Sequence, residues 1–490
     1  MANTTLTNDY ARLSVTNREY GRNRPRWTFL YDSYCGGQDY RLGSYLTRYV
    51  LEQPGEYNAR LLNTPLINHC SAIIAVYMSF LFRNDINRNF EDWEGRADLD
   101  SFLKDTDYEG RNINAFMKEA ECWASVFGHT WIVMSKPNVG ATTLAQEQEM
   151  GIRPYLSLIS PLVANDWRWE RKESGEYELV YFKYIEEVLD KMTILKEITP
   201  TEIRTWVLDD ENKEAHIKSV EVNELGRVPV VILYNEQSVV KGIGVSDIND
   251  IADIQRMIYN LTSEEEQSIR LDGHPSLVVP PTAQLGSGAG ALIVLQEGTD
   301  PGLNPYYLEH GGSNVDNIRN VIKDLEEQIN ALANVGGVRA TATSSQSGVA
   351  LETEFQLLNA RLAEKADNLE LCEEQLWELF SLFQGIEWTG SIKYPDSFSM
   401  RDVEREYREL TLAKTAASSP EAIAVIDYRV RELLDDPNLP EEPASHLVAQ
   451  GLPASGPVKT GPVDPLPAQN ITNPSLRPRR YFSTTNTGLE

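Results

Sequence analysis

Apolar residues between positions 322 and 383 form two helical stripes separated by a polar segment. The first stripe consists of Ile322, Leu325, Ile329 and Leu332. The second recurs at alternating spacings of three and four, as in a helix that packs lengthwise against neighbours. Its members are Phe355, Leu358, Leu362, Leu369, Cys372, Leu376 and Phe383. The pattern predicts a helix over 348–384, about 55 Å long at 1.5 Å per residue. We interpret this length as favouring packing between subunits over packing within one.

The segment between the two stripes, NVGGVRATATSSQSG at 334–348, has almost nothing to bury. Its glycines and small hydroxyl residues predict a mobile loop that projects from the body of the protein. Arg339 is the one charged residue in this loop. A phosphate contact and a solvated side chain both account for that arginine, and the sequence does not decide between them.

The first half of the chain changes from a helical to an alternating pattern near position 130. Helices are predicted at 45–51, 56–82 and 112–127, the last ending at Gly128. The alternating segments that follow predict strands at 130–134, 155–159, 177–184, 203–208 and 228–234. Because these strands follow the helices and do not alternate with them, the predicted fold class is α+β.

A second long helix is predicted from Ser246, whose side chain can cap it, to Gly273. Two short strands, 277–279 and 292–295, then surround a glycine-rich turn. A helix over 314–332 leads from this small module back to the polar loop.

The last part of the chain begins with a short strand at 390–394. Two charged helices follow, one capped by Ser399 and the other by Ser419 with Pro420 at its first position. Beyond Asp436 prolines and small residues dominate. That tail is predicted to be disordered unless a partner orders it.

The net charge of the chain argues against some classes of function. The 490 residues include 73 Asp and Glu against 45 Lys and Arg, a formal net charge of −28. Free binding of nucleic acid through a basic surface is therefore disfavoured. An acidic surface is common in soluble proteins, but it also suits a wall past which a polyanion slides without sticking. Glu264, Glu265 and Glu266 make the far end of the helix that begins at Ser246 strongly acidic.

Cysteines and apolar runs indicate a cytosolic product with no membrane segment. The four cysteines are far apart and lack CxxC spacing, so they are predicted to be reduced core thiols. The polar start of the chain does not resemble a signal peptide. The strongest apolar run, 72–82, is too short to span a bilayer and is predicted to be a buried helix.

Catalytic motifs are weak. The glycines around 451–460 and 286–291 match phosphate-loop and dinucleotide patterns only superficially, since prolines and a strand replace the required helix. The six histidines are scattered singly and form no HxxxH or HExxH pair, which argues against a zinc site. We therefore expect no catalytic residue, no metal and no cofactor, although a glycosidase-type carboxylate pair stays open.

Aromatic and basic residues alternate at Trp167, Arg168, Trp169 and Arg171. This pattern suits stacking on single-stranded nucleic acid. An amphipathic strand with one aromatic face explains it as well, and we favour the strand.

Two segments carry a family resemblance. The run GSYLTRYVLEQPGEYNARLLNTPLINHCSAIIAVYMSFLFR at 43–83, with Tyr45, Leu46 and Arg60, resembles the opening helices of tailed-bacteriophage portal proteins, the head–tail connectors. VPVVILYNE and GIGVSDINDI, within 228–251, are similar to the strand and turn that lead into the first stem helix of that family, particularly in its long-tailed phage group. The resemblance covers about 26–436 and rests on element order more than on residue identity.

The resemblance implies a portal-like, mainly helical architecture. Its parts would be an α/β wing (1–242), stem helix 1 (243–272), a small α/β clip (273–312), stem helix 2 (313–333), a tunnel loop (334–347), a long helix returning to the wing (348–398), a helical crown (399–436) and a flexible Pro-rich tail (437–490). The tail departs from the family pattern. The residues implied to contact DNA are Gly336, Gly337, Arg339, Thr341, Thr343, Ser344, Ser345, Gln346 and Ser347.

The resemblance also implies a function and partners. Portal proteins form a homo-oligomer, a ring of twelve, at one capsid vertex in the virion, after assembly in the host cytoplasm. Double-stranded DNA is packaged and ejected through the ring, which contacts terminase, the major capsid protein and head-completion or adaptor proteins. The alternatives are another phage structural component, such as a head–tail adaptor or minor capsid protein, and an acidic hydrolase. A twelvefold ring with a central hole would distinguish a portal protein from the other phage components. A hydrolase is expected to form discrete particles without a channel.

Overall fold

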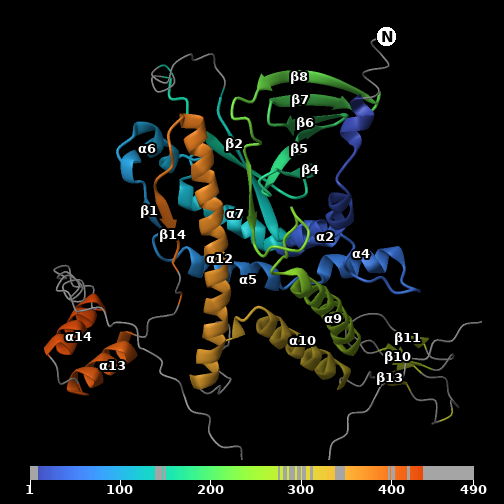
Figure 1. Ribbon diagram of the computed structural model, residues 1–490. Helices are drawn as coiled ribbons and strands as arrows, with labels where there is room; N and C mark the ends of the chain where they lie inside the picture. Colours follow the sequence, from blue (N-terminus) through green and yellow to red (C-terminus); the bar gives the residue numbers. More distant parts are fainter. Residues whose placement is uncertain are drawn as a thin grey trace, which may run out of the picture. The chain divides into compact units, whose positions relative to one another are not determined.

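The computed structural model describes residues 9–137, 146, 150–273, 276–279, 284–285, 293–294, 300, 305–308, 313–336, 348–395, 398, 403–416 and 420–433. The chain divides into two compact units, Met1–Ser399 and Met400–Glu490. Figure 1 labels the elements of each unit.

Helices form the N-terminal part of the first unit. They are α2 (Arg18–Cys35), α3 (Gly37–Leu42), α4 (Pro54–Asn63), α5 (His69–Leu81), α6 (Ala97–Lys104) and α7 (Ile113–Phe127). The predicted helix at 112–127 is confirmed. The side chain of Asn112 caps α7 by accepting a hydrogen bond from the Ala115 N–H group, and Gly128 ends the helix at a φ of +94°.

Two other helix predictions need correction. Residues 45–51 form a loop, and 56–82 is divided into α4 and α5. The division is encoded locally, because the Asn68 side chain accepts a hydrogen bond from the Ser71 N–H group and starts a new helix. Helix α2 was not predicted, since arginines interrupt its apolar positions and Pro25 lies within it.

The strands from β2 to β9 form two antiparallel sheets of different size. The smaller has the order β3-β2-β9, and the larger has the order β4-β5-β6-β7-β8. Their bounds are β2 (His129–Ser135), β3 (Tyr155–Ile159), β4 (Ala164–Arg171), β5 (Tyr177–Leu189), β6 (Met192–Ile198), β7 (Glu202–Asp209), β8 (Glu214–Val222) and β9 (Val230–Tyr234). All five predicted strands are present. The sequence prediction missed β6 and β8, whose charged residues obscure the alternation.

Two long helices leave and re-enter this body. Helix α9 (Asn249–Gly273) leads away from it, and α10 (Ser313–Leu332) returns beside α9 (Figure 1). Between them lie short strands, β10 (Ser276–Val278), β11 (Gln284–Leu285), β12 (Ile293–Val294) and β13 (Tyr306–Leu308). The two strands predicted around one turn do not pair with each other: β10 pairs with β13, and β11 pairs with β12.

Helix α12 (Gly348–Gln384) contains 37 residues, as the apolar pattern predicted. It packs on α5, β2, β9 and β14 (Ser391–Lys393). The seam residues Leu358, Leu362, Leu369, Cys372 and Leu376 are only 0–3% exposed within a single chain. The interpretation that this seam packs between subunits is therefore wrong, since it fills the core of its own subunit.

Strand β14 pairs with β1 (Asn87–Asn89) and returns the chain to the helical part. Beside this pair a cluster of aromatic rings closes the core. Trp377 on α12 lies with Trp93, Phe102 and Trp388, at centroid distances of 5.4 to 6.4 Å. Such contacts stabilise a core beyond the area that they bury.

The second unit contains two helices, α13 (Val403–Ala416) and α14 (Pro420–Leu433), which pack on each other. Lys414 on α13 forms an ion pair with Asp427 on α14. Pro420 occupies the first position of α14, as predicted. The capping residues expected from the sequence, Ser399 and Ser419, lie outside the described residues, as does the Pro-rich tail.

Candidate functional site

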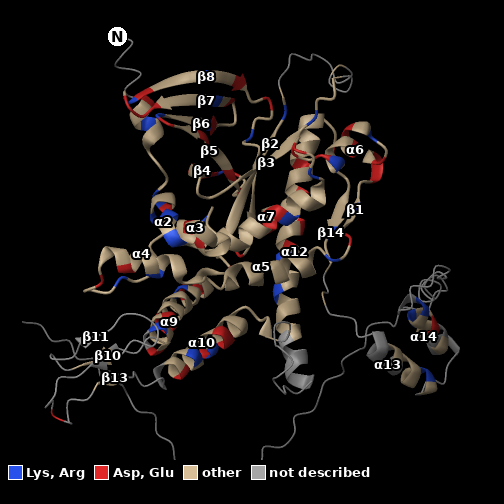
Figure 2. Cartoon of the chain, turned by 180° about the vertical axis from the view of Figure 1, so that it is seen from behind, with Lys and Arg blue, Asp and Glu red and all other residues tan. Residues whose placement is uncertain are grey.

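The stem glutamates lie on the second half of α9. Glu265 accepts a hydrogen bond from Arg319 on α10 at 2.6 Å, and Glu266 pairs with Arg270 one turn later at 2.5 Å. Glu264 is exposed. Two of the three carboxylates therefore have cationic partners, which offsets part of the negative charge at this end of the helix. Figure 2 colours positions of both signs, basic and acidic, on α9 and on α10.

The pair of helices α9 and α10 carries a net negative charge. Helix α9 contains six acidic and two basic residues, and α10 contains four acidic and two basic residues. Duplex DNA is densely anionic, so such a surface disfavours tight phosphate contacts. The Glu265–Arg319 pair also joins the two helices directly.

Three residues at the start of the predicted tunnel loop are described, directly after the end of α10 at Leu332. Asn334 takes a left-handed φ of +55° at the end of α10, and Val335 is fully buried. The Val335 N–H group donates to the Asn330 carbonyl at 3.1 Å. Gly336 is partly exposed. The other candidate residues lie outside the described residues: Gly337, Arg339, Thr341, Thr343, Ser344, Ser345, Gln346 and Ser347.

Both helices that flank this loop are fixed to the same core. The Tyr77 hydroxyl on α5 donates to the Ala333 carbonyl at 2.7 Å, and Arg361 on α12 donates to the Leu332 carbonyl at 3.3 Å. The guanidinium of Arg361 also lies 5.4 Å from the ring centre of Tyr77. The end of α10 and the body of α12 are thus held together by α5.

A buried ionic cluster joins α12 to the turn that precedes α9. We define it as Glu121, Asn235, Asp247, Arg361 and Lys365. Lys365 Nζ lies 3.0 Å from Glu121 Oε1 and 2.7 Å from Asp247 Oδ2, and it donates to Asn235 Oδ1. Arg361 binds Asp247 Oδ1 at 2.9 Å. These residues come from α7, the end of β9, the turn before α9, and α12, so one cluster connects four segments.

Burial and neighbouring charges shift the pKa values of the ionisable groups in this cluster. Burial raises the pKa of Glu121 to about 7, although the charge of Lys365 opposes this. Burial alone would also raise the pKa of Asp247, but the charges of Lys365 and Arg361 outweigh it and lower that pKa. Burial would lower the pKa of Lys365, yet Asp247 and Glu121 keep it raised. The cluster therefore holds a charged lysine between two carboxyl groups.

The end of α7 and the turn before α9 are also in direct backbone contact, at Gly128 and Gly244. A Cβ atom on Gly128 would lie 2.5 Å from the carbonyl carbon and oxygen of Gly244. Gly244 belongs to the turn that resembles the portal family motif. The end of α7 and the entry to α9 can approach this closely only because both residues are glycine.

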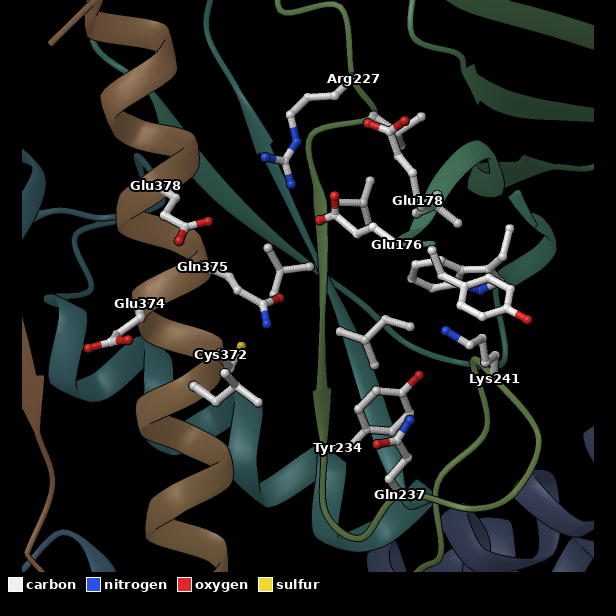
Figure 3. A pocket seen from close by; sticks show the side chains of 18 of the residues that line it. Glu176, Glu178, Arg227, Tyr234, Gln237, Lys241, Cys372, Glu374, Gln375 and Glu378 are labelled. Atoms are coloured by element: carbon white, nitrogen blue, oxygen red, sulfur yellow. The ribbon is translucent and has the colours of Figure 1, made fainter. Parts of the chain in front are cut away.

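A groove of about 580 Å³ lies between α12, β9 and the β4–β5 hairpin (Figure 3). Its lining combines apolar side chains of β9 with charged ones, namely Glu374 and Glu378 of α12 and Glu176, Arg227 and Lys241. The Cys372 thiol faces this region, but burial raises its pKa well above the usual value, so it is a poor nucleophile. The groove offers charges of both signs around apolar surface, which suits contact with polypeptide.

Other candidate chemistry was tested against the described residues. Within them, no group of three His, Cys, Asp or Glu side chains is placed to hold a metal ion. None of their helices is long and apolar enough to cross a membrane. Of the four cysteines, Cys70 and Cys372 are buried, Cys122 is partly buried and Cys35 is exposed, so the prediction of core thiols is wrong for Cys35.

The alternating aromatic and basic residues form strand β4, as favoured from the sequence. Trp167 is buried in the core against Trp131, at a centroid distance of 5.4 Å. Arg168 is exposed and stacks on Tyr181 at 4.7 Å. Because Trp167 is buried, its ring is not available for stacking on nucleic acid.

Comparison with known proteins gives distant structural likenesses. No protein-family model and no curated protein matches the chain. The chain is similar to one in the neck of an empty gene transfer agent particle computed with C6 symmetry, at 10% identity and a TM-score of 0.43, over 80% of this chain and 99% of that one. A chain of the virion of a native gene transfer agent particle matches at 10% identity and a TM-score of 0.39, over 82% and 98%.

A third similar chain belongs to the neck of a native particle of the same kind, computed with C12 symmetry. It matches at 12% identity and a TM-score of 0.38, over 83% of this chain and 99% of that one. At these identities and scores, the function has to be argued from the chain's own residues.

Proposed function

We propose that this chain is a structural component of a phage-type head–tail junction, and specifically a portal protein. In this role twelve copies form a ring at one capsid vertex, and double-stranded DNA passes through it. Terminase, the major capsid protein and head-completion proteins are its partners. The terminase motor supplies the chemistry of DNA packaging. This chain acts as a conduit for the DNA and not as an enzyme.

One observation carries the proposal. A single chain sends out a helix pair with a small strand module between its helices, and continues through a polar segment into a 37-residue helix. The order wing, stem, clip, stem, loop and long helix is the order that the sequence resemblance implies. The two segments that carry the resemblance, 43–83 and 228–251, contain α4 and α5 and the passage from β9 into α9, which supports this order.

The buried ionic cluster supports the same function mechanically. A loop that contacts moving DNA needs rigid supports on both sides, since force on a loose helix would be lost in local motion. Lys365 and Arg361 tie α12 to Asp247 at the entry to the stem, and Tyr77 ties the end of α10 to α5. The net negative stem supports passage of a polyanion without tight binding.

The loop is the part to test. Shortening the segment 338–346 should block DNA packaging while ring assembly stays intact, because Asn334 and Val335, which pack on the core, are retained. Packaged DNA is measured by nuclease protection in particles complemented with the variant. A matched control shortens the wing segment 139–145 by the same method. Normal packaging by the 338–346 variant would remove the loop from the mechanism.

A further inference from the structure

Two adjacent aliphatic side chains project fully into solvent from the loop between α3 and α4. Val50 is 99% exposed and Leu51 is 89% exposed. We call this pair the Val50–Leu51 tip. Single exposed aliphatic residues are ordinary, but a contiguous pair on a fixed loop marks a contact surface.

The loop that carries the tip is held rigidly by a buried arginine. Arg60 on α4 is 3% exposed and donates to Glu52 Oε1 at 2.8 Å and to the Thr47 carbonyl at 2.6 Å. It also donates to Ser263 Oγ on α9 at 3.1 Å and lies 4.1 Å from the ring centre of Tyr49. The loop has therefore already lost its conformational freedom, and docking of its tip costs little further ordering.

The loop is attached to one flank of the stem. Asn260 on α9 accepts a hydrogen bond from the Thr47 N–H group at 2.8 Å and donates to the Tyr45 carbonyl at 3.0 Å. Helix α10 packs on a different face of α9, where Glu265 meets Arg319. Figures 1 and 2 both show α9 between α4 and α10. The tip and α10 thus occupy opposite flanks of the stem.

Two exposed aliphatic residues that border the buried stripe of α10 complement the tip. Val321 and Leu332 are 42% and 48% exposed and lie three turns apart on one side of the helix, with Asp324 between them. Asp324 is exposed and has no ion-pair partner among the described residues. Next to the tip, Arg48 is also exposed. One flank therefore offers an apolar tip with a cation, and the other offers an apolar face with an anion.

We propose that the Val50–Leu51 tip of one copy docks on the Val321 and Leu332 face of the next copy, with Arg48 facing Asp324 across the contact. Two different surfaces on opposite flanks give a head-to-tail interface, which closes into a ring when the rotation between copies is constant. The identity of the partner as a second copy rests on the proposed ring. The inference adds the surfaces that make the contact.

Disruption of the tip is the first test. Leu51→Asp places a charge in the contact and should reduce the ring fraction at least tenfold at micromolar protein, measured by mass photometry. Val239→Asp is the matched control, because Val239 is as exposed as the tip but lies in the turn after β9 and belongs neither to the loop before α4 nor to α10. The control should assemble as the parent chain does.

A charge exchange is the second test, and it separates lost contact from lost folding. Arg48→Glu and Asp324→Arg should each weaken the ring, while the double variant should recover most of the ring fraction. Unchanged rings in Leu51→Asp, or no recovery in the double variant, would overturn the docking while leaving the portal function standing. If the parent chain itself forms no ring, the proposed function fails first.

Discussion

Lys365 on α12 and Asp247 before α9 lie 2.7 Å apart, Nζ to Oδ2, inside the protein, and their side chains are only 3% and 2% exposed. The pair joins the long helix to the entry of the stem. Its charges are compensated within the buried ionic cluster, so loss of one member has consequences that surface ion pairs lack.

The first prediction concerns Lys365. Lys365→Met leaves the carboxyl groups of Glu121 and Asp247 buried without a lysine, and should lower the free energy of unfolding by about 3–5 kcal/mol. The measurement is denaturant unfolding. The matched control is Lys191→Met, which removes the exposed pair with Glu211 and should cost under about 1 kcal/mol. Equal effects of both substitutions would contradict the role of the cluster.

The second prediction concerns pH. The folded pKa of Glu121 is about 7, above its unfolded value near 4.5, so its folded form holds the proton more tightly. The contribution of protonated Glu121 to the free energy of unfolding is complete below pH 4.5 and is lost as the pH rises through 7. A shift of this size is on the order of 3 kcal/mol. Glu121→Gln should remove that loss, so the variant should gain stability relative to the parent between pH 5 and pH 8.

The difference between parent and variant is the quantity to measure, because His129 titrates in the opposite sense. Burial lowers the pKa of His129 to about 3, and its contribution is present above pH 6.5 and lost on acidification. Both proteins retain His129, so it cancels. A stability difference that stays constant across the pH range would show that Glu121 does not titrate there.

The third prediction concerns the contact between Gly128 and Gly244. Gly128→Ala should destabilise the protein by about 3 kcal/mol or more, since the new Cβ meets backbone atoms at 2.5 Å and the φ is +94°. Gly151→Ala is the matched control. Its φ is +67° and nothing lies within 4 Å, so it should cost about 1 kcal/mol of backbone strain alone. Thermal unfolding of both variants gives the comparison.

Local signals in the sequence predicted much of the fold. The apolar seam gave the bounds of α12, and Asn112 with Gly128 gave those of α7, because caps and periodicity are written in neighbouring residues. The loop at 45–51 was mistaken for a helix, since its conformation depends on Arg60 and on Asn260 more than two hundred positions away. Contacts of that range leave no local pattern.

The candidate site was less accessible from the sequence. The members of the buried ionic cluster come from 121, 235, 247, 361 and 365, and no motif links them. A usable signal did exist: Arg361 and Lys365 interrupt the apolar side of α12 between Leu358 and Leu369, and cations in such a position require buried partners. Glu264, Glu265 and Glu266 lie on a helix, as their sequence context predicted. Their partners Arg319 and Arg270 depend on helix pairing and helix spacing.

The most direct test of the portal proposal is electron microscopy of the purified full-length protein, with class averages computed without imposed symmetry. The proposal predicts closed rings of twelve copies around a central channel wide enough for duplex DNA. Discrete particles without a channel, at concentrations where portal rings would be expected to assemble, would contradict it.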